Sequence, residues 1–135
     1  MFFLIIDDDP ARYSEFSDLL FKNGDKYLIT CDPDLVEEIL ENMTDHETCV
    51  ILDHDMPYMN GQEFAKMITR KNRNLPVIIS STTRTPNARE NMVSTFEESN
   101  MISIIIPADH INCEIEWYWW AKGYFACWLG REDAI

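Results

Sequence analysis

The stretch TCVILDHDMPYMNG (residues 48–61) and the earlier stretch FFLIIDDDP (residues 2–10) decide the fold class, because each is an apolar run that ends in an acidic cluster. Both apolar runs have the length and composition of strands and are followed by turn-type residues. If they are parallel strands of one sheet, their carboxyl ends meet at the edge where open α/β sheets bind ligands. Crowded carboxylates there repel one another unless a cation neutralises them, and all-oxygen ligation favours Mg²⁺. The sequence therefore predicts a site as well as a fold.

Strand-like and helix-like segments alternate along the whole chain. The predicted strands are 2–6, 27–31, 49–52, 77–80 and 102–106. The predicted helices are 10–23, a second one opened by Asp32-Pro33, 62–70, 87–99 and 112–129, with Asp9 as the N-cap of the first and Gly24 at its end. This alternation predicts a single α/β domain over residues 1–135: a flavodoxin-like, doubly wound parallel sheet in the order 2-1-3-4-5, with five helices on its two faces.

Composition narrows the classes of function. The chain has 135 residues and a formal net charge of -13, from 24 acidic and 11 basic side chains. So negative a surface disfavours nucleic acid and anionic membranes and suits a basic or cationic partner. Four cysteines form no C-x-x-C pair, no signal peptide precedes the first strand, and no apolar run approaches the roughly 20 residues that span a bilayer. We expect a cytoplasmic protein.

The two acidic motifs resemble a known family. Leu4 to Pro10 with Arg12, then Leu52-Asp53 with Met56-Pro57 and Asn60-Gly61, and later Leu75-Pro76-Val77, are similar to the receiver domain of bacterial response regulators. The resemblance spans nearly the whole chain and implies a two-component signalling module that is phosphorylated by a kinase or by a small phosphodonor. Such a function requires positioning and charge neutralisation more than covalent machinery.

The resemblance also implies a role for each matching residue. Asp53 would be the phosphoacceptor, a nucleophile that forms an acyl phosphate. Asp8 would bind Mg²⁺ directly, with Asp7 beside it, and Asp55 would offer its backbone carbonyl to the metal. Ser81 would donate its hydroxyl to the phosphoryl oxygen. A purely structural role for Asp8 and Asp9 as helix caps leaves Asp7, Asp53 and Asp55 unexplained.

Two departures from the family pattern put ordinary switching in question. Receivers carry a lysine just before the proline that follows strand five, and here Ile106 precedes Pro107. The nearest replacement cations in the sequence are Arg84, Arg89 and His110. The second departure is His54-Asp55 directly after the phosphoacceptor, where an extra acid and a general acid or base would flank the phosphoryl group.

The Asp53-His54-Asp55 triplet is also similar to receiver-like proteins proposed to process cyclic phosphates. Those tend to carry a His-Ser pair after strand four, whereas this chain has Ser80-Ser81-Thr82-Thr83. Three hypotheses therefore compete: a stand-alone receiver phosphorylated on Asp53, a hydrolase or binder of cyclic phosphate that uses this triplet, and a pseudo-receiver that acts only by binding protein. We favour the first. The missing lysine counts against this hypothesis. The retained acids count against the pseudo-receiver, because an inactive site has no physical need for a cluster of mutually repelling carboxylates.

The last helix is unusually aromatic. Trp117, Trp120, Ala121, Tyr124 and Trp128 recur at helical spacing and predict the buried stripe, while Tyr118, Trp119 and Phe125 lie off it. Aromatic side chains beyond those needed for a core are enriched in interfaces. Two explanations compete, an unusually aromatic core and an interface, and we favour a Trp117–Trp128 helix that binds a partner protein or forms a homodimer.

Overall fold

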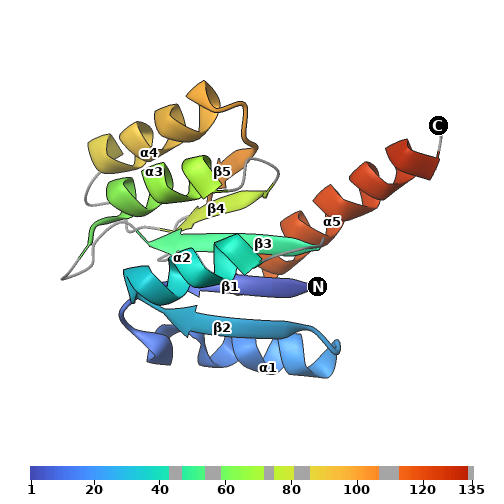
Figure 1. The fold of residues 1–135 in the computed structure, drawn as a ribbon. Helices are drawn as coiled ribbons and strands as arrows, with labels where there is room; N and C mark the ends of the chain where they lie inside the picture. Colours follow the sequence, from blue (N-terminus) through green and yellow to red (C-terminus); the bar gives the residue numbers. More distant parts are fainter. Residues whose placement is uncertain (43–46, 54–58, 72–74, 81–85, 107–112, 134–135) are drawn as a thin grey trace.

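The predicted parallel sheet is present in the computed structural model, which describes residues 1–42, 47–53, 59–71, 75–80, 86–106 and 113–133. Its strands pair in the order β2-β1-β3-β4-β5, all parallel, which confirms the expected topology (Figure 1). The strands are β1 (Phe2–Ile6), β2 (Lys26–Thr30), β3 (Thr48–Asp53), β4 (Val77–Ser80) and β5 (Ser103–Ile105). The helices are η1 (Pro10–Tyr13), α1 (Ser14–Lys22), α2 (Pro33–Asn42), α3 (Gly61–Lys71), α4 (Pro86–Glu98) and α5 (Cys113–Asp133).

Helices cover the sheet on both faces because side chains alternate along each buried strand. In β1, Leu4 and Ile6 pack with α2, α3 and α4, whereas Phe3 and Ile5 pack with η1, α1 and α5. All four side chains are fully buried. The three central strands therefore read as continuous apolar runs, and their carboxyl ends lie along one edge of the sheet.

The first helix differs from the expectation. Residues 10–13 form a 3₁₀ turn and the α-helix begins at Ser14. Asp9 stands at the N-cap position but makes no side-chain cap; instead its backbone N–H donates to Asp7 Oδ1 at 3.0 Å. The predicted end of the helix is confirmed, since Gly24 follows it with a left-handed φ of 73°.

The buried side of α5 also differs from the expected stripe. Its most buried side chains in the described part are Trp117, Tyr118, Ala121 and Phe125, whereas Trp120 and Tyr124 are only partly buried. The prediction placed Tyr118 and Phe125 off the stripe and was wrong there, because aromatic residues at almost every turn hide the helical period. Trp119 is 66% exposed.

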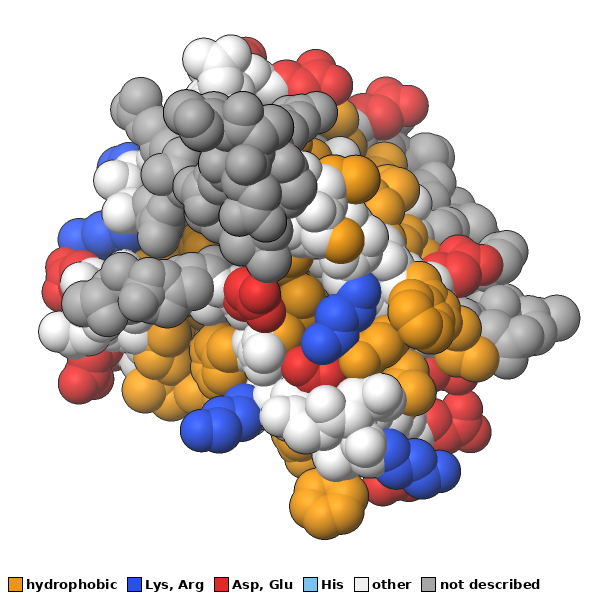
Figure 2. All heavy atoms as spheres, turned by 90° about the vertical axis from the view of Figure 1, so that its right-hand side faces the viewer, with side chains coloured by type: hydrophobic (Ala, Val, Ile, Leu, Met, Phe, Trp, Pro, Cys, Tyr) orange, Lys and Arg blue, Asp and Glu red, His pale blue; other side chains and the backbone are white. Residues whose placement is uncertain are grey.

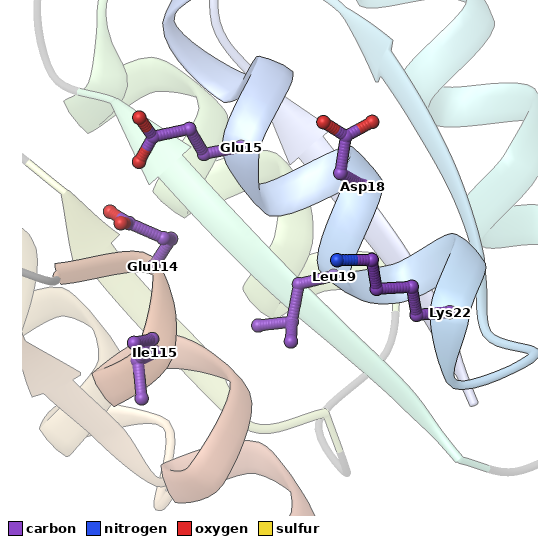
Figure 3. Close-up of a pocket in the computed structure, with 6 residues that line it drawn as sticks. All are labelled: Glu15, Asp18, Leu19, Lys22, Glu114 and Ile115. Carbon is purple, nitrogen blue, oxygen red and sulfur yellow. The ribbon is translucent and has the colours of Figure 1, made fainter.

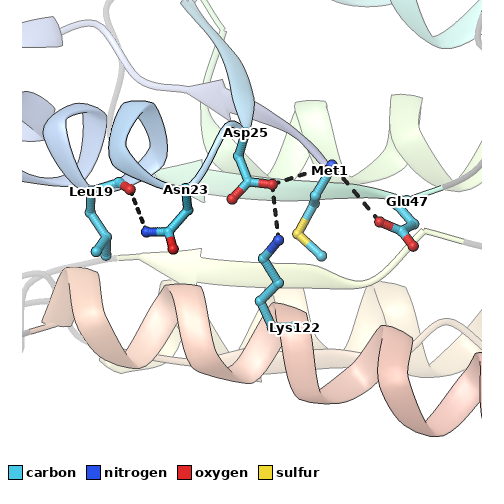
Figure 4. Close-up of polar contacts among 6 residues, drawn as sticks. All are labelled: Met1, Leu19, Asn23, Asp25, Glu47 and Lys122. Carbon is cyan, nitrogen blue, oxygen red and sulfur yellow. Dashed lines mark hydrogen bonds and ion pairs between the residues drawn. The ribbon is translucent and has the colours of Figure 1, made fainter.

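The opposite edge of the sheet, at the amino ends of the strands, has its own polar contacts. Lys122 Nζ lies 2.9 Å from Asp25 Oδ1, and the amino group of Met1 lies 3.3 Å from the same oxygen (Figure 4). Burial acts to raise the pKa of Asp25, but contacts with Lys122, Tyr118 and the terminal amine outweigh it and hold that pKa below its usual value. Figure 2 looks onto this edge and shows acidic, basic and hydrophobic side chains interspersed.

None of the helices, within the ranges that the structure describes, combines the length and apolar character needed to cross a membrane.

Candidate functional site

The two acidic motifs converge at the carboxyl edge of the sheet, as predicted. Asp7 follows β1 and Asp53 ends β3, and the parallel pairing of Ile6 with Leu52 brings them side by side. Asp8 completes a group in which one oxygen from each carboxylate lies within 4.8 Å of the others. Asp7 and Asp53 are 1% and 4% exposed, whereas Asp8 is exposed. The site therefore consists of two buried carboxylates and one that is exposed to solvent.

Two residues of the turn after β1 hold Asp7 in place. The Tyr13 hydroxyl donates to Asp7 Oδ2 at 2.6 Å, and Arg12 Nη1 donates to the same oxygen at 3.3 Å. Arg12 Nη1 also lies 3.8 Å from Asp53 Oδ2, so its guanidinium bridges the two strands. The 3₁₀ geometry of residues 10–13 brings both side chains back over the strand end. Sequence analysis assigned neither residue to the site.

The ionisation of these groups follows from burial and from each other's charge. Burial raises the pKa of Asp7 above its usual value, although bonds from Tyr13 and from the Asp9 backbone and the charge of Arg12 act in the opposite direction. Burial and then the charge of Asp7 raise the pKa of Tyr13, so its hydroxyl keeps its proton and remains a donor. Burial lowers the pKa of Arg12, but the charges of Asp7, Tyr13 and Asp53 raise it overall.

A buried hydroxyl stands beside Asp53. Ser80 ends β4 and pairs with Asp53 in the sheet register. Because Ile51 and Ile78 both pack toward α1 and α5, the residues two positions further on, Asp53 and Ser80, face the same side. Ser80 is fully buried, and its Oγ has no hydrogen-bond partner among the residues that the structure describes. A buried polar atom without a partner is uncommon and indicates a place for a ligand oxygen.

The position of the family lysine is filled by an apolar side chain. Ile106 follows β5, is 5% exposed and packs in the same cluster as Trp117. Its backbone N–H donates to the Ile79 carbonyl at 3.1 Å, and its own carbonyl accepts from Trp117 Nε1 at 3.4 Å. The Ile106 backbone is thus held by β4 and α5 while its side chain contributes packing and no charge.

Several predicted site residues lie outside the described residues. These are His54, Asp55, Ser81, Arg84 and His110. Arg89 lies in α4, but its side chain is not among those described. The hypothesis of cyclic-phosphate chemistry depends on His54 and Asp55 and stays a prediction.

A second concave feature lies away from the acidic cluster. It is a groove of about 310 Å³ between α1 and α5, lined by Glu15, Asp18, Leu19, Lys22, Glu114 and Ile115 (Figure 3). Leu19 projects from α1 toward α5, while Glu15 and Glu114 place carboxylates at one end of the groove. Its apolar floor and acidic rim offer no set of groups suited to phosphoryl chemistry.

Comparison with known proteins agrees with this geometry. The family model of the response regulator receiver domain matches residues 3–104. The two-component response regulator ARR21 of Arabidopsis thaliana is 31% identical over 78 residues, a match that spans 58% of this chain and only 13% of that relative.

Solved structures show the same fold. The receiver domain of the sensor histidine kinase PA1611 from Pseudomonas aeruginosa, solved with magnesium in its active-site cleft, has a TM-score of 0.64 at 16% identity, covering 85% of this chain and 90% of that one. NtrX from Brucella abortus has a TM-score of 0.74 at 17% identity, covering 99% of this chain and 29% of that one. At such identities the likeness concerns the fold alone. The family match, which covers well over half of the sequence, shows that the chain belongs to the response regulator receiver domain family.

Proposed function

We propose that the chain is a receiver-type signalling module that binds Mg²⁺ at Asp7, Asp8 and Asp53 and accepts a phosphoryl group on Asp53. The observation that carries this proposal is the convergence of the three carboxylates within 4.8 Å at the carboxyl edge of the sheet. Their donor atoms are all oxygens, which suits a hard divalent cation, and the exposed Asp8 leaves a path from solvent. The magnesium held by the PA1611 receiver domain supports the same assignment.

The chemistry follows from the placement of these groups. An Asp53 carboxylate oxygen attacks the phosphorus of an acyl phosphate or a phosphohistidine, the new O–P bond forms, and the donor leaves with the electrons of the broken bond. Mg²⁺, when bound, would neutralise charge on the phosphoryl oxygens. The Ser80 hydroxyl lies buried beside Asp53 with no partner in the described part of the chain, and it is placed to donate to one of those oxygens. Tyr13 holds Asp7 in position during the reaction through its hydrogen bond to Oδ2.

The test is the intact mass of the protein after incubation with Mg²⁺ and a small acyl-phosphate donor. We expect the wild type to gain one phosphoryl group and Asp53→Asn to gain none, because the amide is not a nucleophile. Asp18→Asn, at an exposed site in α1, is the matched control and is expected to react like the wild type. A wild type that binds Mg²⁺ but gains no mass would contradict phosphorylation and favour a screen of cyclic phosphates.

We also propose that the exposed aromatic side of α5 joins two copies of the chain. Trp119 and Ile115 are 66% and 44% exposed and lie one turn apart on α5. A surface that contains a large exposed indole is typical of interfaces, and a two-fold dimer brings the same patch together from both copies. Because each copy carries a net charge of -13, salt that screens this repulsion should strengthen the dimer.

Sedimentation velocity tests this proposal. We expect a dimer in the wild type that becomes more populated as salt is raised. We expect a monomer in Trp119→Glu, because the dimer interface would then bury a glutamate from each copy. Phe21→Glu replaces an 85% exposed ring in α1 and should leave the dimer intact. A wild type that stays monomeric at high salt, or a Trp119→Glu variant that stays dimeric, would exclude this surface.

A further inference from the structure

A positive charge already stands at the acidic site, and it comes from the chain itself. Arg12 Nη1 lies 3.3 Å from Asp7 Oδ2 and 3.8 Å from Asp53 Oδ2. Both carboxylates are almost fully buried, so each needs a compensating partner while it is ionised. Arginine keeps its charge at any physiological pH, and its planar group can face two carboxylates at once. Arg12 therefore neutralises part of the cluster before any metal binds.

The same contacts place Arg12 in competition with a metal. A divalent cation that ligates Asp7 and Asp53 would approach the same two carboxylates that face the guanidinium, and two cations so close repel each other. The arginine side chain is 32% exposed, whereas Asp7 is fully enclosed. Unlike Asp7, the guanidinium therefore has access to solvent, and it can leave while Tyr13 still holds Asp7 through its 2.6 Å hydrogen bond.

We propose that Arg12 is a tethered counter-cation that occupies the Asp7–Asp53 pair in the metal-free protein and that a divalent cation must displace. The inference rests on the proposed function in one respect, the binding of a divalent ion at this site. It goes beyond it by assigning a regulator to the site: Arg12 sets the concentration of metal at which the site fills. It also gives the site a positive group in a chain whose family lysine position holds Ile106.

Calorimetric titration of Mg²⁺ into wild type and Arg12→Gln tests the inference. The glutamine variant should bind at least about tenfold more tightly, because the competing charge is gone. Arg12→Lys keeps the positive charge, so its Mg²⁺ affinity should remain within about threefold of that of the wild type. Only the planar shape of the guanidinium is lost, and we expect that loss to have little effect. Arg70→Gln, at an exposed arginine in the last turn of α3, is the matched control and should not change the affinity.

Thermal unfolding gives a second readout that a merely structural role would not produce. Without metal, Arg12→Gln should melt below the wild type, because two buried carboxylates lose a partner; saturating Mg²⁺ should remove that difference. Equal or weaker Mg²⁺ binding by folded Arg12→Gln would overturn the inference, as would a deficit that Mg²⁺ leaves unchanged. If Arg12→Gln does not fold, Arg12→Met, which keeps the apolar stem, is measured against the same criteria.

The outcomes separate this inference from the proposed function. Tighter binding by Arg12→Gln with no phosphorylation of the wild type would uphold the inference and reject the phosphoacceptor. Binding of Mg²⁺ by Arg12→Gln and not by the wild type would also uphold the inference, since Arg12 would then exclude the metal completely. Phosphorylation of the wild type with unchanged affinity in Arg12→Gln would uphold the proposed function and reject the inference. Absence of binding in both proteins would reject the inference.

Discussion

Replacement of Phe16 by alanine is expected to lower the free energy of unfolding by about 3–5 kcal/mol, the usual cost of removing a buried ring. Phe16 is 1% exposed in α1 and packs edge-on against Phe3 and Trp117, with ring centroids 5.2 and 5.5 Å away. It thereby joins α1, β1 and α5, and these elements cannot all close on the cavity that alanine would leave. Equilibrium unfolding in urea, followed by circular dichroism, measures the change.

The chain offers a matched control in the same helix. Phe21 is 85% exposed, so Phe21→Ala should change the free energy of unfolding by no more than about 0.5 kcal/mol. Both substitutions remove the same ring and add the same helix propensity, and they differ only in burial. Similar effects of the two substitutions would mean that the face of the sheet toward α1 and α5 is not packed as described.

The second large effect is expected for Asp7→Asn, which should reduce Mg²⁺ affinity more than about 100-fold, because loss of even an outer partner of a metal ligand costs 10–100-fold. Asparagine keeps the shape and can still accept the Tyr13 hydrogen bond, so the change isolates the charge. Calorimetric titration of Mg²⁺ measures the affinity, with Asp18→Asn as the exposed control. Unchanged affinity would place the metal elsewhere.

The same substitution should have the opposite effect on metal-free stability. Burial raises the pKa of Asp7 above 3.8, the ordinary value of an aspartate, so its ionised form is less favourable in the folded than in the unfolded chain. The wild type therefore gains stability from this group as pH falls through its folded pKa, and the gain is complete below 3.8. Asp7→Asn lacks this dependence. Its stability relative to wild type should be greatest at neutral pH and shrink toward pH 3.8, as measured by urea unfolding at a series of pH values.

The sequence predicted the fold well because each central strand contains an unbroken apolar run, such as Cys49–Leu52 in β3. Val77–Ser80 and Phe2–Ile6 were predicted to the residue, since Pro76 and Asp7 mark their ends clearly. The α5 face was predicted poorly, because Trp, Tyr and Phe occur on several sides of that helix and erase the contrast that periodicity needs. Propensity likewise predicted an α-helical first turn at residues 10–13, where the contacts of Asp7 favour a 3₁₀ turn instead.

The site was predictable in its acids and not in its supporting residues. Asp7 and Asp8 follow β1 and Asp53 ends β3, so the topology alone brings them together. Arg12 and Tyr13 reach the same place only because residues 10–13 fold back over the strand end, which a sequence cannot show. Proximity in the sequence to the family lysine position therefore favours Arg84, Arg89 and His110 as replacement cations, whereas the structure brings Arg12 to the site. Ser80 was passed over for Ser81, since a hydroxyl within a buried strand has no distinguishing pattern.

Tyr13 contacts both the acidic cluster and the aromatic core beside α5. Its hydroxyl binds Asp7 at 2.6 Å, and its ring lies 5.6 Å from that of Trp117, whose indole N–H donates to the Ile106 carbonyl. Only one tyrosine therefore separates the acidic cluster from a buried indole on α5. Indole emission is sensitive to nearby charge and to the rigidity of its surroundings. In a chain whose other three tryptophans are replaced by phenylalanine, the fluorescence of Trp117 would be a built-in optical probe of events at Asp7, without any label attached to the protein.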